Sequence, residues 1–191
     1  MRLKSSNGSS ANSLRFHIKG VSLIEVLIAI VVASIGLLAL AGVNTAAIRY
    51  TKMSQYRGTA TLLANDIGER IRANRLGAGS YVVGTDFSTQ ATLPSAPAKL
   101  CDSYGGGVPC TAAEVATADL YTWQLRVREQ LPNGSVFIAY QNVQNAYDVW
   151  LVWRDPAVAS DDVVSTGSEC PGALTVAADP SVRCSYFRIN V

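Results

Sequence analysis

The chain is short of the residues on which most enzymes and metal sites depend. It has one histidine, His17, and it contains neither a G-x-S-x-G nucleophile motif nor an H-E-x-x-H zinc motif. None of its four cysteines stands in a C-x-x-C pair, the spacing typical of structural zinc sites. The sequence therefore predicts a protein that is not an enzyme and that uses no metal and no cofactor.

Charged residues are also scarce. They make up 16% of the 191 residues, against about 25% in typical soluble domains, while apolar residues make up 49%. Four of the 16 basic residues, Arg2, Lys4, Arg15 and Lys19, fall in the first 20 positions, which leaves 12 basic against 14 acidic residues in the rest. Nucleic-acid binding needs clustered cations, so this balance argues against it. The apolar excess favours contact with lipid or with partner subunits.

The cysteines, Cys101, Cys110, Cys170 and Cys184, all lie in the C-terminal half. An even number behind a membrane segment indicates disulfides formed in an oxidising compartment. Three pairings are open from sequence alone. The two local ones, Cys101 with Cys110 and Cys170 with Cys184, are favoured because each closes a loop rich in Gly, Pro and Ser.

Other candidate sites have plainer interpretations. The glycines 105–107 lack the Gly-Lys-Ser/Thr that a phosphate loop requires. Asp155, Asp161 and Asp162 could offer oxygens to calcium, but their spacing fits no dedicated loop and solvated acids in turns are commoner. For the aromatic residues Trp123, Trp150 and Trp153, core packing is favoured over a binding face.

The N-terminus differs from an ordinary secretory signal. Residues 1–20 are basic and polar, and the 23 residues from Val26 to Ile48 then carry no charge. As a helix this stretch rises roughly 35 Å, enough to span a bilayer core. A secretory signal has an apolar stretch of only about 7–15 residues with its cleavage site behind it. Here the best processing signal, Lys19-Gly20, precedes the apolar stretch, so cleavage would retain the helix.

Glu25 is the one acid at the start of this apolar stretch. A carboxylate at membrane depth is costly and usually faces a partner. The alternative is a capping box, Ser22-x-x-Glu25, in which the Glu side chain satisfies an amide at the helix N-terminus. Local sequence does not decide between these two interpretations.

The segment KGVSLIEVLIAIVVASIGLL, residues 19–38, resembles the type IV pilin and pseudopilin family. The resemblance implies that a prepilin peptidase cuts between Gly20 and Val21 and methylates the new amino terminus. It also implies that Glu25, the fifth mature residue, aids assembly by pairing with the terminal amine of a neighbouring subunit. Val21 departs from the family pattern, in which Phe is usual.

Charge predicts the orientation of the chain. Basic residues at positions 2–19 favour a cytoplasmic N-terminus by the positive-inside rule, although Arg49, Lys52 and Arg57 lie just beyond the other end. The cysteines favour a periplasmic C-terminal part more firmly. We therefore expect a single-pass membrane protein whose C-terminal part lies in the periplasm. The resemblance to type IV pilins implies that it is held in the inner membrane and later joins a cell-surface pilus.

The helical pattern continues past Arg49. Apolar residues recur at helical spacing and predict one buried stripe: Ala60, Leu63, Ala64, Ile67 and Ile71. Arg72, Arg75 and Gly77 indicate an end near Leu76. The apolar half has no proline, and we hypothesise that Gly36 and Gly42 loosen it locally.

The remainder predicts an α+β fold, a long N-terminal helix packed on an antiparallel sheet of three or four strands. A capping box at Thr111 and Glu114 opens a short helix to about Leu120. Alternation over Tyr121–Val127 predicts a strand, and the turn at 132–134 leads it into a hairpin with Ser135–Val143. Further strands are expected at 147–153, in the centre of the sheet, and at 182–191.

The predicted domains are a leader (1–20), a long helix (21–76, with a membrane and assembly part at 21–48 and an amphipathic part at 49–76) and a periplasmic head (77–191). The segments TLLANDIGERIRANR and VWLVWRD resemble minor pilins in particular. The resemblance implies a minor structural subunit that contributes to pilus assembly, adhesion and twitching motility, with other pilins, the peptidase and the inner membrane as partners. A minor pseudopilin of a type II secretion system and an unrelated single-pass periplasmic binding protein remain alternatives.

Overall fold

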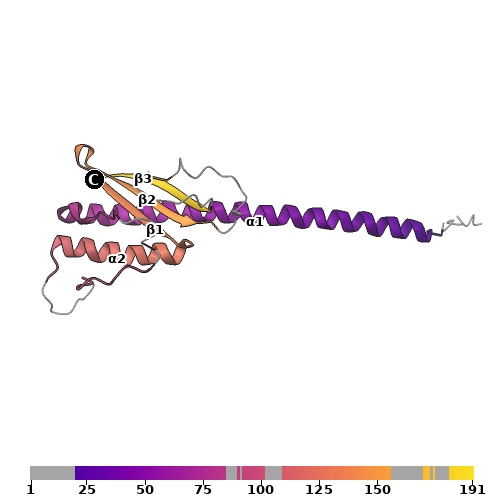
Figure 1. The fold of residues 1–191 in the computed structure, drawn as a ribbon, viewed down its shortest axis with the longest axis horizontal. Coiled ribbons are helices and arrows are strands. Elements are labelled where there is room, and N and C mark those ends of the chain that lie inside the picture. The colour runs from indigo at the N-terminus through magenta and orange to yellow at the C-terminus, as the bar shows by residue number, and fades with distance from the viewer. Residues whose placement is uncertain are drawn as a thin grey trace, which may run out of the picture. The chain divides into compact units, whose positions relative to one another are not determined.

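A computed structural model describes residues 20–84, 90, 92–101, 109–155, 170–172, 174 and 181–191. The chain forms two compact units, residues 1–45 and residues 46–191. Within these described ranges, two α-helices and three strands follow one another in the order α1, α2, β1, β2, β3, with a short 3-10 helix after α1 and another between β1 and β2 (Figure 1). The unit that begins at residue 46 has the expected α+β arrangement of a helix on a three-stranded antiparallel sheet.

Helix α1 (Leu23–Ala73) confirms the long helix, ending three residues before the predicted Leu76. Its C-terminal part buries all five predicted stripe residues together with Gly68. A 3-10 helix, η1 (Arg75–Ser80), follows at once, and the backbone N–H of Gly77 donates to the carbonyl of Asn74 at 3.0 Å. The chain therefore turns where Asn and Gly end the helical pattern.

Helix α2 (Ala112–Gln130) corrects two predictions. The expected short helix does begin at the capping box of Thr111 and Glu114, but it continues through the segment 121–127 that alternation assigned to a strand. The hairpin between that segment and Ser135–Val143 is consequently wrong. Trp123 and Val127 fit both a period of two and helical spacing, and the burial of Leu120, Trp123 and Val127 on α1 follows the helical spacing.

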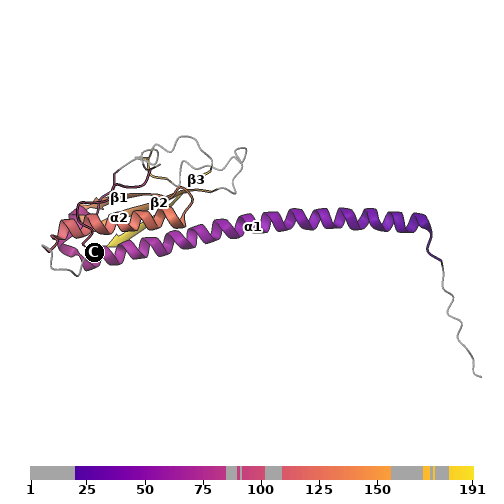
Figure 2. The ribbon, with the colours of Figure 1, turned by 90° about the horizontal axis from the view of Figure 1, so that it is seen from below.

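α2 runs antiparallel to the C-terminal part of α1, and the two helices lie side by side in two perpendicular views (Figures 1 and 2). Two contacts fix this direction. Asn74, directly after α1, contacts Ala112 at the start of α2, whereas Leu63, earlier in α1, contacts Trp123 in the second half of α2. The indole Nε1 of Trp123 donates to the carbonyl oxygen of Leu63 at 2.9 Å. This buried hydrogen bond satisfies the only polar atom of a large core side chain.

The sheet has the order β1 (Ser135–Gln141), β2 (Ala146–Arg154), β3 (Val182–Asn190), antiparallel throughout. The predicted central position of residues 147–153 and the predicted last strand are both confirmed. The turn before β1 places Asn133 at a φ of 49°, a left-handed conformation that Asn tolerates.

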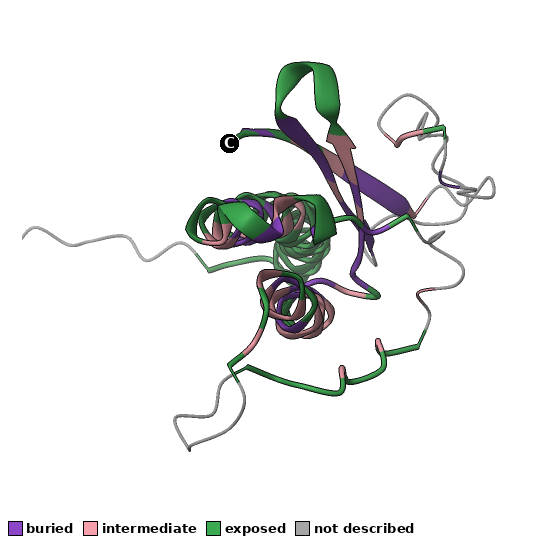
Figure 3. Ribbon diagram, turned by 90° about the vertical axis from the view of Figure 1, so that its left-hand side faces the viewer, coloured by how far each residue is buried: buried purple, intermediate pink, exposed green. Residues whose placement is uncertain are grey.

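Helix α2 and the C-terminal part of α1 lie on one side of the sheet (Figure 3). The main core fills the space between them and contains Trp123 and Trp153, both fully buried. A smaller apolar cluster lies on the opposite face, which we call the outer face, and contains Val152, Val182 and Cys184. Core packing is thus confirmed for two of the three tryptophans, while Trp150 is half-buried and belongs to the outer face.

Candidate functional site

The start of α1 carries the predicted processing and assembly residues. Gly20 and Val21 precede the helix and are exposed, whereas Lys19 and the rest of the leader lie outside the described residues. The carbonyl of Ser22 accepts from the backbone N–H groups of Glu25 and Val26 at 3.0 and 3.3 Å. These bonds open the helix through backbone atoms.

The side chains of Ser22 and Glu25 form no capping box. Among the described residues neither the Ser22 hydroxyl nor the Glu25 carboxylate has a side-chain hydrogen bond or ion pair. Glu25 is exposed in the isolated chain. The local explanation for an acid at this position therefore loses its support, and the carboxylate is available to a group from another molecule.

The first part of α1 exposes a continuous apolar surface. Every residue from Val21 to Ile48 is exposed, and α1 contains a stretch long and apolar enough to cross a membrane, none of it buried within the chain. Exposed fractions of its large side chains range from 47% at Val26 to 78% at Leu23. A surface of this size does not remain in contact with water in a soluble protein. Lipid or neighbouring helices must cover it.

Hydroxyl groups in this part of the helix are satisfied internally. The hydroxyl of Ser34 donates to the carbonyl of Ile30 at 2.7 Å, and that of Thr45 donates to the carbonyl of Ala41 at 3.0 Å. Such bonds to the preceding turn let a polar side chain reside in an apolar medium. Glu25 differs from them because it has no such partner in the part of the chain that the structure describes.

The two glycines of the apolar part do not interrupt the helix. α1 is continuous through Gly36 and Gly42, and a Cβ added at either glycine would meet nothing within 4 Å. The proposed loosening is therefore not a property of the isolated chain, and it remains a hypothesis about the assembled state.

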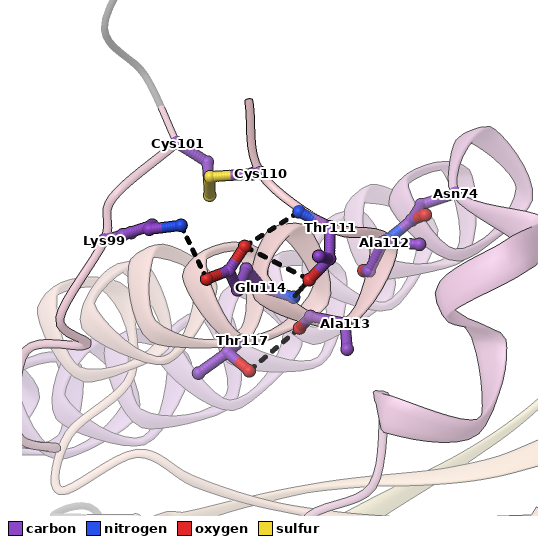
Figure 4. Close-up of a disulfide and its surroundings, with 9 residues drawn as sticks. All are labelled: Asn74, Lys99, Cys101, Cys110, Thr111, Ala112, Ala113, Glu114 and Thr117. Atoms are coloured by element: carbon purple, nitrogen blue, oxygen red, sulfur yellow. Dashed lines mark hydrogen bonds and ion pairs between the residues drawn. A yellow bond between two sulfur atoms is a disulfide. The ribbon is translucent and has the colours of Figure 1, made fainter. Parts of the chain in front are cut away.

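The first disulfide joins Cys101 to Cys110 directly before α2 (Figure 4). Thr111 and Glu114 form a complete capping box, in which the Glu114 backbone N–H donates to the Thr111 hydroxyl oxygen and the Thr111 backbone N–H donates to Glu114 Oε2. Lys99 lies 2.8 Å from the other carboxylate oxygen, Oε1. The ammonium of Lys99 and the backbone N–H of Thr111 lower the pKa of Glu114 to about 2.

The second disulfide joins Cys170 to Cys184 on the outer face of the sheet. Leu174 packs there against Val152 and Val182. Both disulfides are the local pairings that the sequence favours. Each fastens an irregular segment to a regular element, to the start of α2 in one case and to β3 in the other.

A polar network between α1 and α2 has no counterpart among the predicted site residues. The guanidinium of Arg70 contacts Asp66 on its own helix at 3.1 Å and Asp119 of α2 at 3.0 Å. The Tyr81 hydroxyl donates to the other oxygen of Asp119 at 2.5 Å, and burial together with this bond raises the pKa of Tyr81. Opposite charges spaced along two predicted helices are a signal for such a network, but no sequence pattern indicates which helices face each other.

The structure supports no metal or nucleotide site in the part it describes. No group of three or more His, Cys, Asp or Glu side chains that could hold a metal occurs among the described residues. Asp155 is buried at the end of β2, while its proposed calcium partners Asp161 and Asp162, and the glycines 105–107, lie outside the described residues. The feature of the described chain that calls for a partner is the exposed apolar surface of α1.

Comparison with known proteins agrees with this view. A family model described as type IV pilin Tt1218 matches residues 42–121, and the model of the prokaryotic N-terminal methylation motif matches residues 15–41. No curated protein and no solved structure matches the chain. The chain is thus similar to type IV pilins from residue 42 to residue 121 and carries the prokaryotic N-terminal methylation motif directly before that stretch.

Proposed function

We propose that this protein is a minor structural subunit of a type IV pilus. One observation carries the proposal. The first part of α1 exposes apolar side chains along its whole length and carries a single acid, Glu25, that has no partner in the described chain. A surface of that kind suits a subunit that is stored in a membrane and later packs its helix against other helices.

The proposed maturation follows from the methylation motif. Residues 1–20 act as a leader that the prepilin peptidase removes between Gly20 and Val21, and the new amino group is methylated. Residues 21–48 remain as the membrane and assembly part of the helix, and residues 49–76 connect it to a periplasmic head formed by residues 77–191. The two disulfides fit a head that folds in an oxidising compartment.

Glu25 has a defined role in this proposal. In a bundle of apolar helices an unpaired carboxylate is costly, and a complementary ammonium offsets that cost. Because cleavage creates an amino group four residues before Glu25, each mature subunit offers one cation and one anion to its neighbours. Pairing between subunits then sets their axial spacing as well as their contact.

The end of the long helix and the VWLVWRD strand resemble the minor pilin called PilV, and we propose the same role for this chain. In that role it contributes to pilus assembly and so to adhesion and twitching motility. The alternative with the most support is a minor pseudopilin of a type II secretion system, which shares the N-terminal motif. A membrane-anchored periplasmic binding protein is a further alternative, and it predicts that the leader is not cleaved at Gly20.

The test is incorporation of Glu25 variants into filaments. We expect Glu25→Ala to lower the amount of this subunit in sheared filaments at an unchanged membrane level, and Glu25→Gln to have an intermediate effect. Glu69→Ala is the matched control, because Glu69 is an exposed acid on the same helix beyond the apolar part. Incorporation of Glu25→Ala at the control level would contradict the pairing model. Whether the purified filaments are surface pili or secretion pseudopili separates the first two functions.

A further inference from the structure

The outer face of the sheet carries a row of three aromatic side chains. The strand register places Phe137 of β1 opposite Trp150 of β2, and Trp150 opposite Tyr186 of β3. Ring centroids are 5.5 Å apart in the first pair and 5.0 Å apart in the second. We call these three residues the aromatic row. Side chains alternate between the faces of a strand, so the row lies on the face that α1 and α2 leave uncovered.

Tyr186 ends this row on an edge strand and is 48% exposed. Its hydroxyl donates to Asp148 Oδ1 at 2.7 Å, and the side-chain amide of Gln141 donates to Asp148 Oδ2 at 2.8 Å. Asp148 itself is only 8% exposed. A buried carboxylate thus holds an exposed ring and an exposed amide in place, which lowers the entropy lost when a ligand binds to them.

Hydrogen-bond donors and acceptors lie next to the exposed ring of Tyr186. Arg188 lies opposite Asp148 in the strand register, is exposed, and offers the planar N–H donors of its guanidinium. The side-chain oxygen of Gln141 can accept a hydrogen bond after its amide has donated to Asp148, while Arg188 already donates to the Tyr186 hydroxyl. Ala139, on the other side of Asp148, is small. The formal charges of Asp148 and Arg188 cancel, so the site as a whole is neutral.

This combination fits a neutral sugar better than a protein partner. The cores of protein interfaces are depleted of charged residues, whereas here a carboxylate and a guanidinium flank the exposed ring. A pyranose has an apolar C–H face, which packs on an aromatic ring, and a rim of hydroxyls that both donate and accept. The exposed ring of Tyr186 offers a surface for such a C–H face, and Gln141 and Arg188 beside it offer hydrogen-bonding groups for the hydroxyls.

We propose that the outer face of the sheet is a binding site for a neutral glycan. The sugar ring stacks on Tyr186, and Gln141 and Arg188 bind its hydroxyls. Asp148 is a positioning residue, because it acts by holding Tyr186 and Gln141.

The experiment uses the fluorescence of Trp150 as the reporter. The full chain is held in lauryldimethylamine oxide, a detergent without a sugar headgroup, and titrated with lactose, maltotriose and chitotriose. 3′-Sialyllactose serves as the charged probe. Trp123 and Trp153 are fully buried in the main core, so they supply a constant background while Trp150 responds. We expect saturable quenching by at least one neutral sugar and weaker quenching by the sialylated one.

Variants assign the response to the site. Tyr186→Ala should weaken binding roughly tenfold or more, since it removes both the stacking surface and the group held by Asp148. Tyr186→Phe keeps the ring but loses the bond to Asp148, so we expect a loss of a few fold only, and Arg188→Ala should also weaken binding. Val143→Ser is the control, because Val143 is 99% exposed in the connection between β1 and β2. Unchanged melting temperatures show that the variants fold.

Three results would overturn the proposal. They are no response to any of the neutral sugars, binding of the sialylated sugar alone, and equal binding by Tyr186→Ala and the control. A different result would assign the face to a second copy of the chain. In that case the fluorescence emission of Trp150 would shift to the blue as the protein concentration rises, Tyr186→Ala would abolish the shift, and sugar would have no effect.

Discussion

Gly68 of α1 lies against Ile189 of β3, and a Cβ added at Gly68 would stand 3.3 Å from the Cδ1 atom of Ile189. The helix therefore approaches the sheet so closely at Gly68 that even a methyl group would require Ile189 to shift by a few tenths of an ångström. Gly58, ten residues earlier on the same helix, faces open space. The two glycines form a matched pair that separates helix propensity from packing.

We expect Gly68→Leu to lower the free energy of unfolding by about 1–3 kcal/mol, the usual effect of overpacking a core. Gly58→Leu should instead raise it by up to about 1 kcal/mol, because Leu is a better helix former than Gly. Urea unfolding of the full chain in detergent, followed by far-UV circular dichroism, measures both. Equal stability of the two variants would show that α1 does not pack on β3 as described.

Gly77 and Gly79 give a second matched pair, at the junction of η1 with α2. A Cβ added at Gly77 would collide with the carbonyl oxygen of Ala112, whereas one added at Gly79 would meet nothing within 4 Å. Gly77→Ala should therefore cost about 1–3 kcal/mol of stability and Gly79→Ala should have little effect. Thermal unfolding of both variants measures the difference. An equally mild effect of Gly77→Ala would mean that the carbonyl of Ala112 does not lie against Gly77.

Glu114 makes the start of α2 sensitive to acid. Its pKa in the folded chain is lowered to about 2 from an ordinary value of 4.5, first by Lys99 and then by the Thr111 backbone N–H. A lowered pKa means that the carboxylate stabilises the fold fully above about pH 4.5, and that this contribution is lost as the pH falls towards 2.

Glu114→Gln keeps an acceptor for the capping box but does not titrate. We therefore expect the stability of the wild type to decline more steeply than that of this variant between pH 5 and pH 2 (the window set by the cited pKa values). Tm measured at several pH values for both proteins is the test. Parallel curves would mean that the Lys99–Glu114 ion pair is not formed in solution.

The Cys170–Cys184 disulfide should contribute substantially to the stability of the sheet. It closes a loop with a sequence separation of 14 residues. Loop-closure entropy for that length corresponds to about 3 kcal/mol. The double variant Cys170→Ala with Cys184→Ala should lose roughly that amount, measured by urea unfolding under non-reducing conditions. A wild type that loses no stability on full reduction would contradict this expectation.

Periodicity predicted the parts of the fold whose pattern has a single interpretation. Along α1 only a helix brings Ala60, Leu63, Ala64 and Ile67 onto one face, and these residues are buried as expected. β2 is apolar on both faces, which only a central strand can bury, and it lies between two strands. In both cases the local pattern of apolar residues indicates the same element that the tertiary contacts bury.

The prediction of a strand from Tyr121 to Val127 was wrong for a physical reason. Trp123 and Val127 are four residues apart, a spacing that satisfies alternation and helical periodicity equally. What decides is packing with α1, where the Trp123 indole reaches the Leu63 carbonyl, a contact 60 positions away in sequence. For the same reason the aromatic row could not be predicted, because it requires the register of three strands.

A filament subunit of the proposed kind must keep the apolar part of α1 in the mature protein. The most direct test is the intact mass and N-terminal sequence of the chain purified from its native membrane. We expect a product that begins at Val21 and carries one methyl group on its amino nitrogen. A product that still contains residues 1–20, or one that begins beyond Ile48, would contradict it.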